Sequence, residues 1–119
     1  MPRYVLLILD DPNRASSAGQ AGAEMAKMGR FAGELAKQGK ITGGNPLKPM
    51  AEAVRVREKG GRLTVTDGPF TETKEMVGGF FVIEAANRQE AIEIAKQCPH
   101  TALGSVEVRE VLEVGGPPR

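Results

Sequence analysis

The segment Asp67-Gly-Pro-Phe-Thr-Glu-Thr-Lys-Glu75 is the point from which the fold of this chain can be worked out. It holds three carboxylates and one ammonium around a Gly-Pro corner. Proline fixes its own φ and pushes the preceding residue to extended geometry, so the corner has a defined shape. A charged loop between two strands is a common place for chemistry in a small domain. We call residues 67–75 the signature loop.

Strand patterns lie on both sides of the signature loop. Before it, Val54-Arg-Val56 and Leu63-Thr-Val65 alternate apolar and polar residues, and Lys59-Gly-Gly61 between them predicts a β-hairpin. After it, Gly79–Glu84 is rich in Phe, Val and Ile, which is typical of a buried strand. Residues 41–50 contain two glycines and two prolines, so we expect a loop there.

A strand and a long helix are predicted before the hairpin. Arg3–Leu9 is almost entirely apolar and has the length of a central, covered strand. Residues 17–38 are predicted to form a helix because apolar residues recur at spacings of three and four. These residues are Met25, Met28, Ala32 and Leu35. Gly39 stands where a helix C-terminal cap belongs.

A second helix and a last strand complete the chain. Asn87 and Glu90 have the spacing of a capping box, and Pro99 ends the helix that they begin. Val106–Glu110 starts with clean alternation and predicts a strand. The resulting order, β-α-β-β-β-α-β, fits an α+β domain: a ferredoxin-like sandwich with an added β-strand.

This fold has a consequence for assembly. The helices of such a domain cover one face of a mainly antiparallel sheet. The other face needs cover if it is apolar, and a second copy of the chain is a common solution. We therefore expect a homodimer that packs sheet against sheet.

Length and composition set further limits. The 119 residues fit one domain, which we place at residues 1–112, followed by a flexible tail at 113–119. The net charge of +1 argues against direct nucleic-acid binding. No apolar run approaches membrane-spanning length, and no signal-peptide pattern is present. Cys98 is the single cysteine, so no internal disulfide can form, and we expect a cytoplasmic protein.

Several separated motifs, in the right order, resemble the YCII-related family and its DGPF group. The signature loop carries the DGPF motif, and Tyr4–Ile8, Gly78–Phe81, Cys98-Pro99 and Ser105–Arg109 resemble other family segments. The resemblance covers roughly residues 1–112 and implies a dimeric ferredoxin-like fold of the α+β barrel type. Some relatives look like small lyases or dehalogenating enzymes acting on hydroxylated aromatics. Some DGPF domains are associated with sigma-factor-like transcription proteins.

The signature loop supplies the first candidate site residues. Asp67 could act as a general base, or its carboxylate could close an Asx-turn. Phe70 could stack on a ligand, although core or interface packing is the commoner role of Phe. Lys74, if enclosed by Glu72 and Glu75, could bind an anionic or enolate oxygen; otherwise these groups form solvated ion pairs of little energy.

Two candidates lie outside the loop. His100, the single histidine, could move a proton near neutral pH, or it could be a surface residue beyond a helix C-terminus. Arg109 could clamp a carboxylate, or it could form a cross-strand ion pair with Glu84. Cys98 lies on the apolar stripe of the second helix and is expected to be buried.

No cofactor or metal is expected. There is no Walker motif, and the paired glycines Gly43-Gly44 and Gly60-Gly61 do not form a dinucleotide fingerprint. One histidine and one cysteine make a poor metal-ligand set.

Three functional hypotheses remain open. The chain could hold a small-molecule site in each half of a dimer, with Asp67 or His100 moving a proton in a cofactor-independent lyase or isomerase reaction. It could be a non-catalytic binding or regulatory protein, linked to transcription through a protein partner. In the third hypothesis, the charges of the signature loop only shape the dimer.

Overall fold

The computed structural model describes residues 1–14, 18–70 and 73–114. Glu72 of the candidate cluster and residues 115–119 of the expected tail lie outside the described residues. Of the rest of that tail, Glu113 accepts two hydrogen bonds from the Arg3 guanidinium, at 3.1 and 3.2 Å. In chain order the elements are β1 (Arg3–Asp10), α1 (Ala18–Lys37), β2 (Ile41–Pro46), η1 (Met50–Glu52), β3 (Val54–Lys59), β4 (Arg62–Asp67), β5 (Met76–Glu84), α2 (Arg88–Lys96), η2 (Pro99–Ala102) and β6 (Ser105–Glu110).

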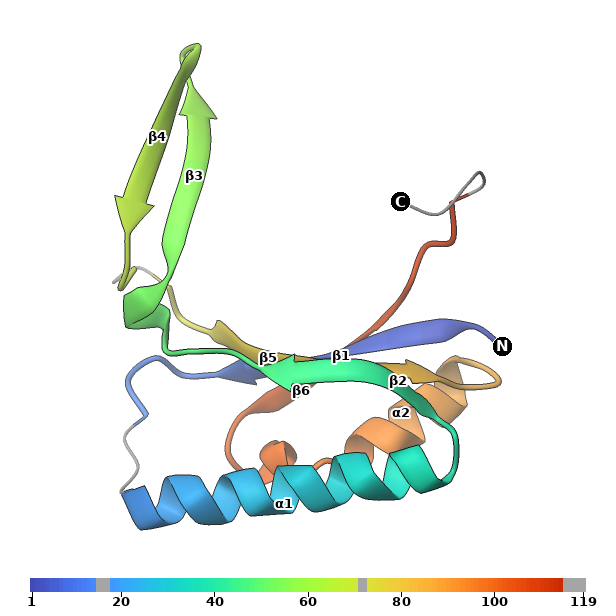
Figure 1. Ribbon diagram of the computed structural model, residues 1–119. Coiled ribbons are helices and arrows are strands. Elements are labelled where there is room, and N and C mark those ends of the chain that lie inside the picture. The colour runs from blue at the N-terminus through green and yellow to red at the C-terminus, as the bar shows by residue number, and fades with distance from the viewer. Residues whose placement is uncertain (15–17, 71–72, 115–119) are drawn as a thin grey trace.

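The main sheet has four antiparallel strands in the order β2-β5-β1-β6. β1 is central, and its Leu6 lies opposite Phe81 of β5 on one side and Val108 of β6 on the other. Both helices lie against the same face of this sheet (Figure 1). The prediction of a mixed α+β fold is therefore confirmed.

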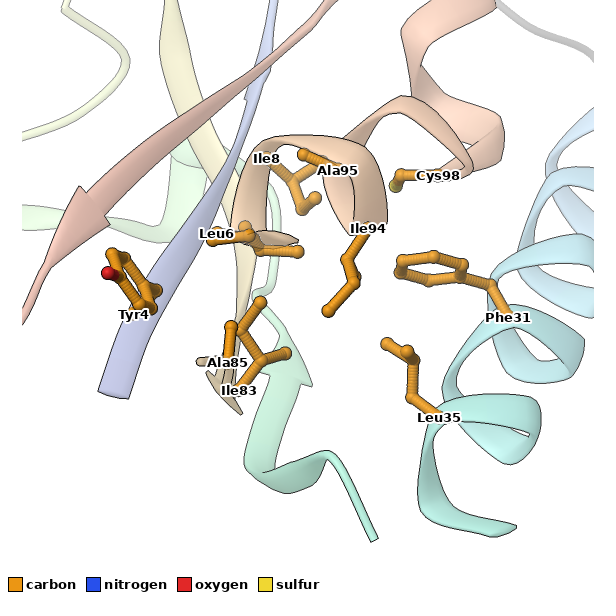
Figure 2. Close-up of a cluster of buried hydrophobic side chains, with 11 residues drawn as sticks. Tyr4, Leu6, Ile8, Phe31, Leu35, Ile83, Ala85, Ile94, Ala95 and Cys98 are labelled. Atoms are coloured by element: carbon orange, nitrogen blue, oxygen red, sulfur yellow. The ribbon is translucent and has the colours of Figure 1, made fainter. Parts of the chain in front are cut away.

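The hydrophobic core fills the space between that face and the helices. β1 contributes every second residue to it, so alternation along the strand decides which side chains are buried. Figure 2 shows the side chains of the sheet and of both helices meeting in this layer. The buried residues are Tyr4, Leu6, Ile8, Phe31, Leu35, Ile83, Ala85, Ala91, Ile94, Ala95 and Cys98. Truncating a residue as enclosed as Leu6 to alanine costs about 2–5 kcal/mol of stability.

Local signals fix the helix ends. Asn87 accepts a hydrogen bond from the Glu90 main-chain N–H at 2.9 Å, and the Glu90 carboxylate accepts one from the Ala86 N–H at 2.9 Å. This confirms the predicted cap of α2. At the end of α1, Gly39 has a φ of 69°. The left-handed residue lets the Lys40 N–H reach the Leu35 carbonyl at 2.9 Å, which closes the last turn.

The expectation of a loop over residues 41–50 was wrong. Residues Ile41–Pro46 form β2, which pairs with β5. β2 is an edge strand, where proline is tolerated because one side of the strand has no partner. Gly44 has a φ of 146°, and a Cβ there would lie 2.9 Å from Phe81. Glycine and proline thus mark a close-packed edge rather than a loop.

The predicted hairpin is present, but it does not add a strand to the main sheet. β3 and β4 form a separate two-stranded sheet, from Val54 opposite Asp67 to Lys59 opposite Arg62. It projects from the end of the main sheet, on the side away from the helices (Figure 1). Every residue of both strands is exposed. We call residues 54–67 the arm.

The sheet face opposite the helices is apolar at its centre. Because side chains alternate, the residues between the buried positions of β1 point to this side, and their partners on β5 share it. These half-buried residues are Val5, Leu7, Leu9, Phe80 and Val82. No helix of the described residues lies on this side, and the sheet does not close into a barrel within one chain (Figure 1). We call the sheet face formed by the half-buried residues of β1 and β5 named above the open face.

Candidate functional site

A cleft of about 510 Å³ lies between α1 and the end of the main sheet. Its wall is mostly apolar and includes Met25 and Met28 of α1 and Phe81 of β5. Polar side chains also line it, among them Asp10, Arg14, Glu24 and His100. The volume suits a small organic molecule, and an apolar wall with a few polar groups is the usual composition of a ligand site. We call it the helix–sheet cleft.

An ion-pair network lies at one end of the cleft. The guanidinium of Arg14 donates to both carboxylate oxygens of Asp10, at 2.8 and 2.7 Å. It also donates to the carboxylate of Glu24 on α1, at 3.0 and 3.4 Å. The network ties the chain after β1 to the first half of α1. Bidentate pairs of this kind have a defined geometry as well as a favourable energy.

The network fixes the charge of its members. The hydrogen bonds from Arg14 hold the pKa of the Asp10 carboxyl below its usual value, against the opposing effect of burial. The nearby charge of His100 lowers the same pKa further. The hydrogen bonds to Asp10 and Glu24 raise the pKa of Arg14. Asp10 is therefore ionised and Arg14 is charged at neutral pH.

His100 is buried, contrary to the alternative that placed it on the surface. It lies in η2 and is 6 % exposed. Its Nε2–H donates a 2.7 Å hydrogen bond to the main-chain carbonyl of Leu9. A carbonyl can only accept, so Nε2 carries a hydrogen, and in the neutral form of the ring Nδ1 is the nitrogen with the lone pair. The structure thus assigns one tautomer to this histidine.

Gly104 leaves room for that hydrogen bond. A Cβ at Gly104 would lie 2.8 Å from Nε2 of His100 and would collide with the carbonyl oxygen of Leu9. A side chain at this position would therefore have to push the two partners apart. The turn between η2 and β6 consequently depends on glycine for steric reasons.

The described charges of the signature loop, Asp67, Lys74 and Glu75, do not gather around a buried ammonium. Asp67 is exposed at the end of β4, and the main-chain N–H of Gly68 after it donates to Ala53 at 2.8 Å. Lys74 is exposed. Glu75 is exposed too, and accepts a 3.0 Å hydrogen bond from the Ser105 hydroxyl. Among the described residues, no hydrogen bond forms an Asx-turn at Asp67.

Phe70 is the buried member of the loop, at 7 % exposure. The Arg55 guanidinium lies over its ring, 3.7 Å from the centroid, and also donates to the Thr73 hydroxyl at 3.2 Å. Phe70 and Glu75 line a second hollow, of about 520 Å³, at the base of the arm. Phe70 therefore holds the base of the arm and has one face covered by a cation.

Arg109 lies apart from both hollows. It is exposed on β6, opposite Val5 of β1. Glu84, the alternative ion-pair partner, lies on β5 opposite Arg3. Because β1 separates β5 from β6, these two residues are not on neighbouring strands. The candidates from the sequence therefore fall into three places: the cleft, the base of the arm and the sheet surface.

Sequence reasoning missed the ion-pair network. It ended the first strand at Leu9 and gave no functional role to Asp10 or Arg14. The spacing of four between Asp10 and Arg14 was the available signal, since opposite charges at that spacing can pair in a compact turn. Glu24 could not be found in this way, because the fold brings α1 back to the end of β1.

Comparison with known proteins identifies the family of this chain. Residues 2–115 match the YCII-related domain. The chain belongs to the YCII-related family. This YCII-related chain is also 31 % identical, over 110 residues, to the uncharacterized protein R00369 of Rhizobium meliloti (strain 1021). The match covers 89 % of each of the two proteins.

Two features are absent from the described part of this YCII-related chain. None of its helices has the length and apolar character needed to cross a membrane. No group of three or more His, Cys, Asp and Glu side chains within that part is placed to hold a metal ion.

Proposed function

We propose that this YCII-related protein binds a small, largely apolar molecule in the helix–sheet cleft and that His100 exchanges a proton with it. One observation carries the proposal: a buried histidine with a fixed tautomer lines a ligand-sized apolar cleft, beside an ionised carboxylate. Buried titratable groups in a cleft are frequent in functional sites. A cofactor-independent lyase or isomerase reaction is the class of chemistry that this arrangement supports.

The tautomer of His100 limits which ligand groups can exchange a proton with it. Nε2 of His100 is committed to the Leu9 carbonyl, so Nδ1 is the atom left to accept a proton. The matching ligand group is an acidic O–H or C–H donor, such as a phenol or the carbon beside a carbonyl. Asp10 offers a counter-charge to the imidazolium that forms, and Arg14 keeps that carboxylate ionised. Arg14 is thus a positioning residue.

The signature loop is the second location for a ligand. Its Asp67-Gly-Pro-Phe70 motif supports placement in the DGPF group of the family. Asp67, Lys74 and Glu75 are exposed, so a ligand there would compete with solvent at each charge. The cleft is the better site because His100 is already desolvated in it.

A thermal-shift screen tests where a ligand binds. The panel holds hydroxylated aromatics, lactones, small carboxylates and phosphates. A ligand at 100 times its dissociation constant stabilises the fold by about 2.7 kcal/mol. For a domain of this size that raises Tm by several degrees. We expect at least one hydroxylated aromatic or lactone to shift the wild type.

Matched variants assign the hit to a site. Gly29 lies on α1 at the cleft wall, and a Cβ there meets no atom within 4 Å. Gly29→Leu should therefore fold, occupy part of the cleft and abolish the shift, whereas Asp67→Asn should keep it. His100→Gln keeps a donor for Leu9 but lacks the basic nitrogen, so it should bind without turnover. A shift that survives Gly29→Leu and disappears in Asp67→Asn would move the site to the signature loop.

We also infer that two copies form a homodimer through their open faces, with each chain folded as a ferredoxin-like sandwich. The strand order and the helices on one face support the fold. The apolar open face supports the dimer, because a patch of this kind on a water-exposed sheet usually meets a partner. Leu7→Asp should convert the dimer to a monomer in sedimentation analysis. A wild type that stays monomeric at all concentrations would refute the dimer and leave the cleft proposal untouched.

A further inference from the structure

The arm carries a large apolar surface that no part of the chain described by the structure covers. Four of its aliphatic side chains are more than half exposed: Val54 at 53 %, Val56 at 67 %, Leu63 at 75 % and Val65 at 68 %. An isolated two-stranded hairpin is only marginally stable in water. An arm with this surface needs support from outside the chain.

The register places these four residues on one face. Val56 lies opposite Val65, and Leu63 lies opposite Glu58 on the same side. The other face of the arm is polar and basic, with Arg55, Arg57, Lys59, Arg62, Thr64 and Thr66. Arg55 holds that basic face against Phe70 and Thr73 at the base. Since side chains alternate, the apolar face is turned away from this contact.

The chain as a whole is too extended for a monomer of its length. Its accessible surface is 8403 Å², whereas the scaling for folded monomers gives about 6,200 Å². Its radius of gyration is 16.4 Å, against about 13.5 Å expected for a compact domain. The excess surface of about 2,200 Å² is comparable to what each copy gives up in an obligate dimer, about 1,000–2,500 Å².

The arm and the open face lie on the same side of the main sheet, and the arm stands at an angle to the open face (Figure 1). A second copy related by a two-fold axis would present the same two surfaces, its own arm and its own open face. Such a contact is self-complementary and would cover both apolar surfaces at once. An unrelated partner would have to match two surfaces that stand at an angle to each other.

We propose that the apolar face of the arm packs on a second copy of the chain, so that each copy is clasped by the arm of the other. This inference rests on the homodimer proposed above and extends it from the open face to the arm. In the assembly, Val54, Val56, Leu63 and Val65 become buried, while Arg57, Lys59 and Arg62 stay at the rim.

Neighbouring substitutions on opposite faces of β4 test the proposal. Leu63→Asp places a charge on the apolar face, and Thr64→Asp places the same charge one residue along, on the polar face. Both positions are exposed in the single chain, so both variants should fold, which circular dichroism would check. We expect Leu63→Asp to raise the dimer dissociation constant at least ten-fold in sedimentation equilibrium, and Thr64→Asp to leave it within two-fold.

Amide hydrogen exchange gives a second readout on the wild-type protein. Main-chain amides of β3 and β4 should exchange at least ten-fold more slowly above the dimer dissociation constant than below it. Equal exchange at both concentrations, or a dimer that tolerates Leu63→Asp as well as Thr64→Asp, would overturn the proposal for the arm alone. A wild type without any dimer would overturn both the arm contact and the open-face dimer.

Discussion

The ring of His100 and the main-chain carbonyl of Leu9 are 91 positions apart in the sequence and 2.7 Å apart in the structure. This contact joins η2 to the end of β1, and it gives the histidine its orientation at the cleft. The same hydrogen bond leaves the ring one basic atom. A structural contact therefore decides which ring nitrogen would take part in the proton exchange proposed for His100.

Two substitutions test how much the hydrogen bond from His100 to the Leu9 carbonyl stabilises the fold. His100→Phe keeps an aromatic ring, although a larger one, and leaves the Leu9 carbonyl without its donor, which should cost at least about 1–3 kcal/mol of unfolding free energy. His100→Gln retains an N–H donor and should cost less than half of that amount. Urea denaturation would measure both values. Equal losses in the two variants would show that the Leu9 contact does not stabilise the fold.

Replacing Asp10 should change how stability depends on pH. The pKa of Asp10 is lower in the folded chain than in the unfolded chain. Its stabilisation is therefore complete above about pH 4 and is lost as the pH falls through the folded pKa. Asp10→Asn should lower stability at pH 7 and flatten the decline below pH 4, measured by urea denaturation at several pH values.

Glu93 supplies the control for that experiment. Its pKa is also lowered, mainly by the hydrogen bond from Lys96, but both side chains of this pair are largely exposed. Exposed ion pairs contribute about 0–1 kcal/mol. Glu93→Gln should therefore leave the pH profile close to that of the wild type. A larger effect from Glu93→Gln than from Asp10→Asn would contradict the assignment of the main acid-sensitive contact to the cleft.

Two glycine-to-alanine substitutions should have opposite signs. Gly104→Ala should destabilise the fold by about 1–3 kcal/mol, because overpacking of a close contact has that cost. Gly33→Ala lies inside α1, where a Cβ meets no atom within 4 Å. It should stabilise by up to about 1 kcal/mol through helix propensity. Thermal unfolding of the two variants beside the wild type checks this, and a Gly104→Ala protein with unchanged Tm would count against the steric argument.

Cys98 should react slowly in the native protein. It is 1 % exposed, and burial raises the pKa of its thiol. The thiolate is the reactive form, so a thiol reagent should modify native protein at least about ten-fold more slowly than urea-unfolded protein at pH 7.5. A native rate equal to the unfolded rate would mean that the packing around Cys98 opens readily. Cys98→Ser, which lacks the thiol, controls for other reacting groups.

Local signals predicted much of the fold. The Asn87 cap, the Gly39 cap and the arm needed only a few neighbouring residues, and all three are present. β2 was missed because a Gly-Pro composition looks the same in a loop and in an edge strand that packs closely on its neighbour. Whether a hairpin joins the main sheet is likewise decided by contacts outside the hairpin.

The candidate site was less accessible to sequence reasoning. The His100 ring and Asp10 come together because η2 packs under the end of β1, which is a long-range contact. The burial of His100 depends on Gly104 and Leu9 rather than on its own neighbours in the helix pattern. The signature loop, by contrast, is conspicuous in the sequence because its charges are close together, although the structure leaves Asp67, Lys74 and Glu75 exposed.

The base of the arm closes on itself through the 2.8 Å hydrogen bond between Gly68 and Ala53. The two ends of the arm therefore lie side by side. None of the arm residues belongs to the hydrophobic core. The arm is in this sense a module, so we expect insertions, deletions or grafted sequences at its tip to leave the cleft and the main sheet unaltered. Evolution, or a protein engineer, could therefore change the surface of the arm without rebuilding the domain that carries it.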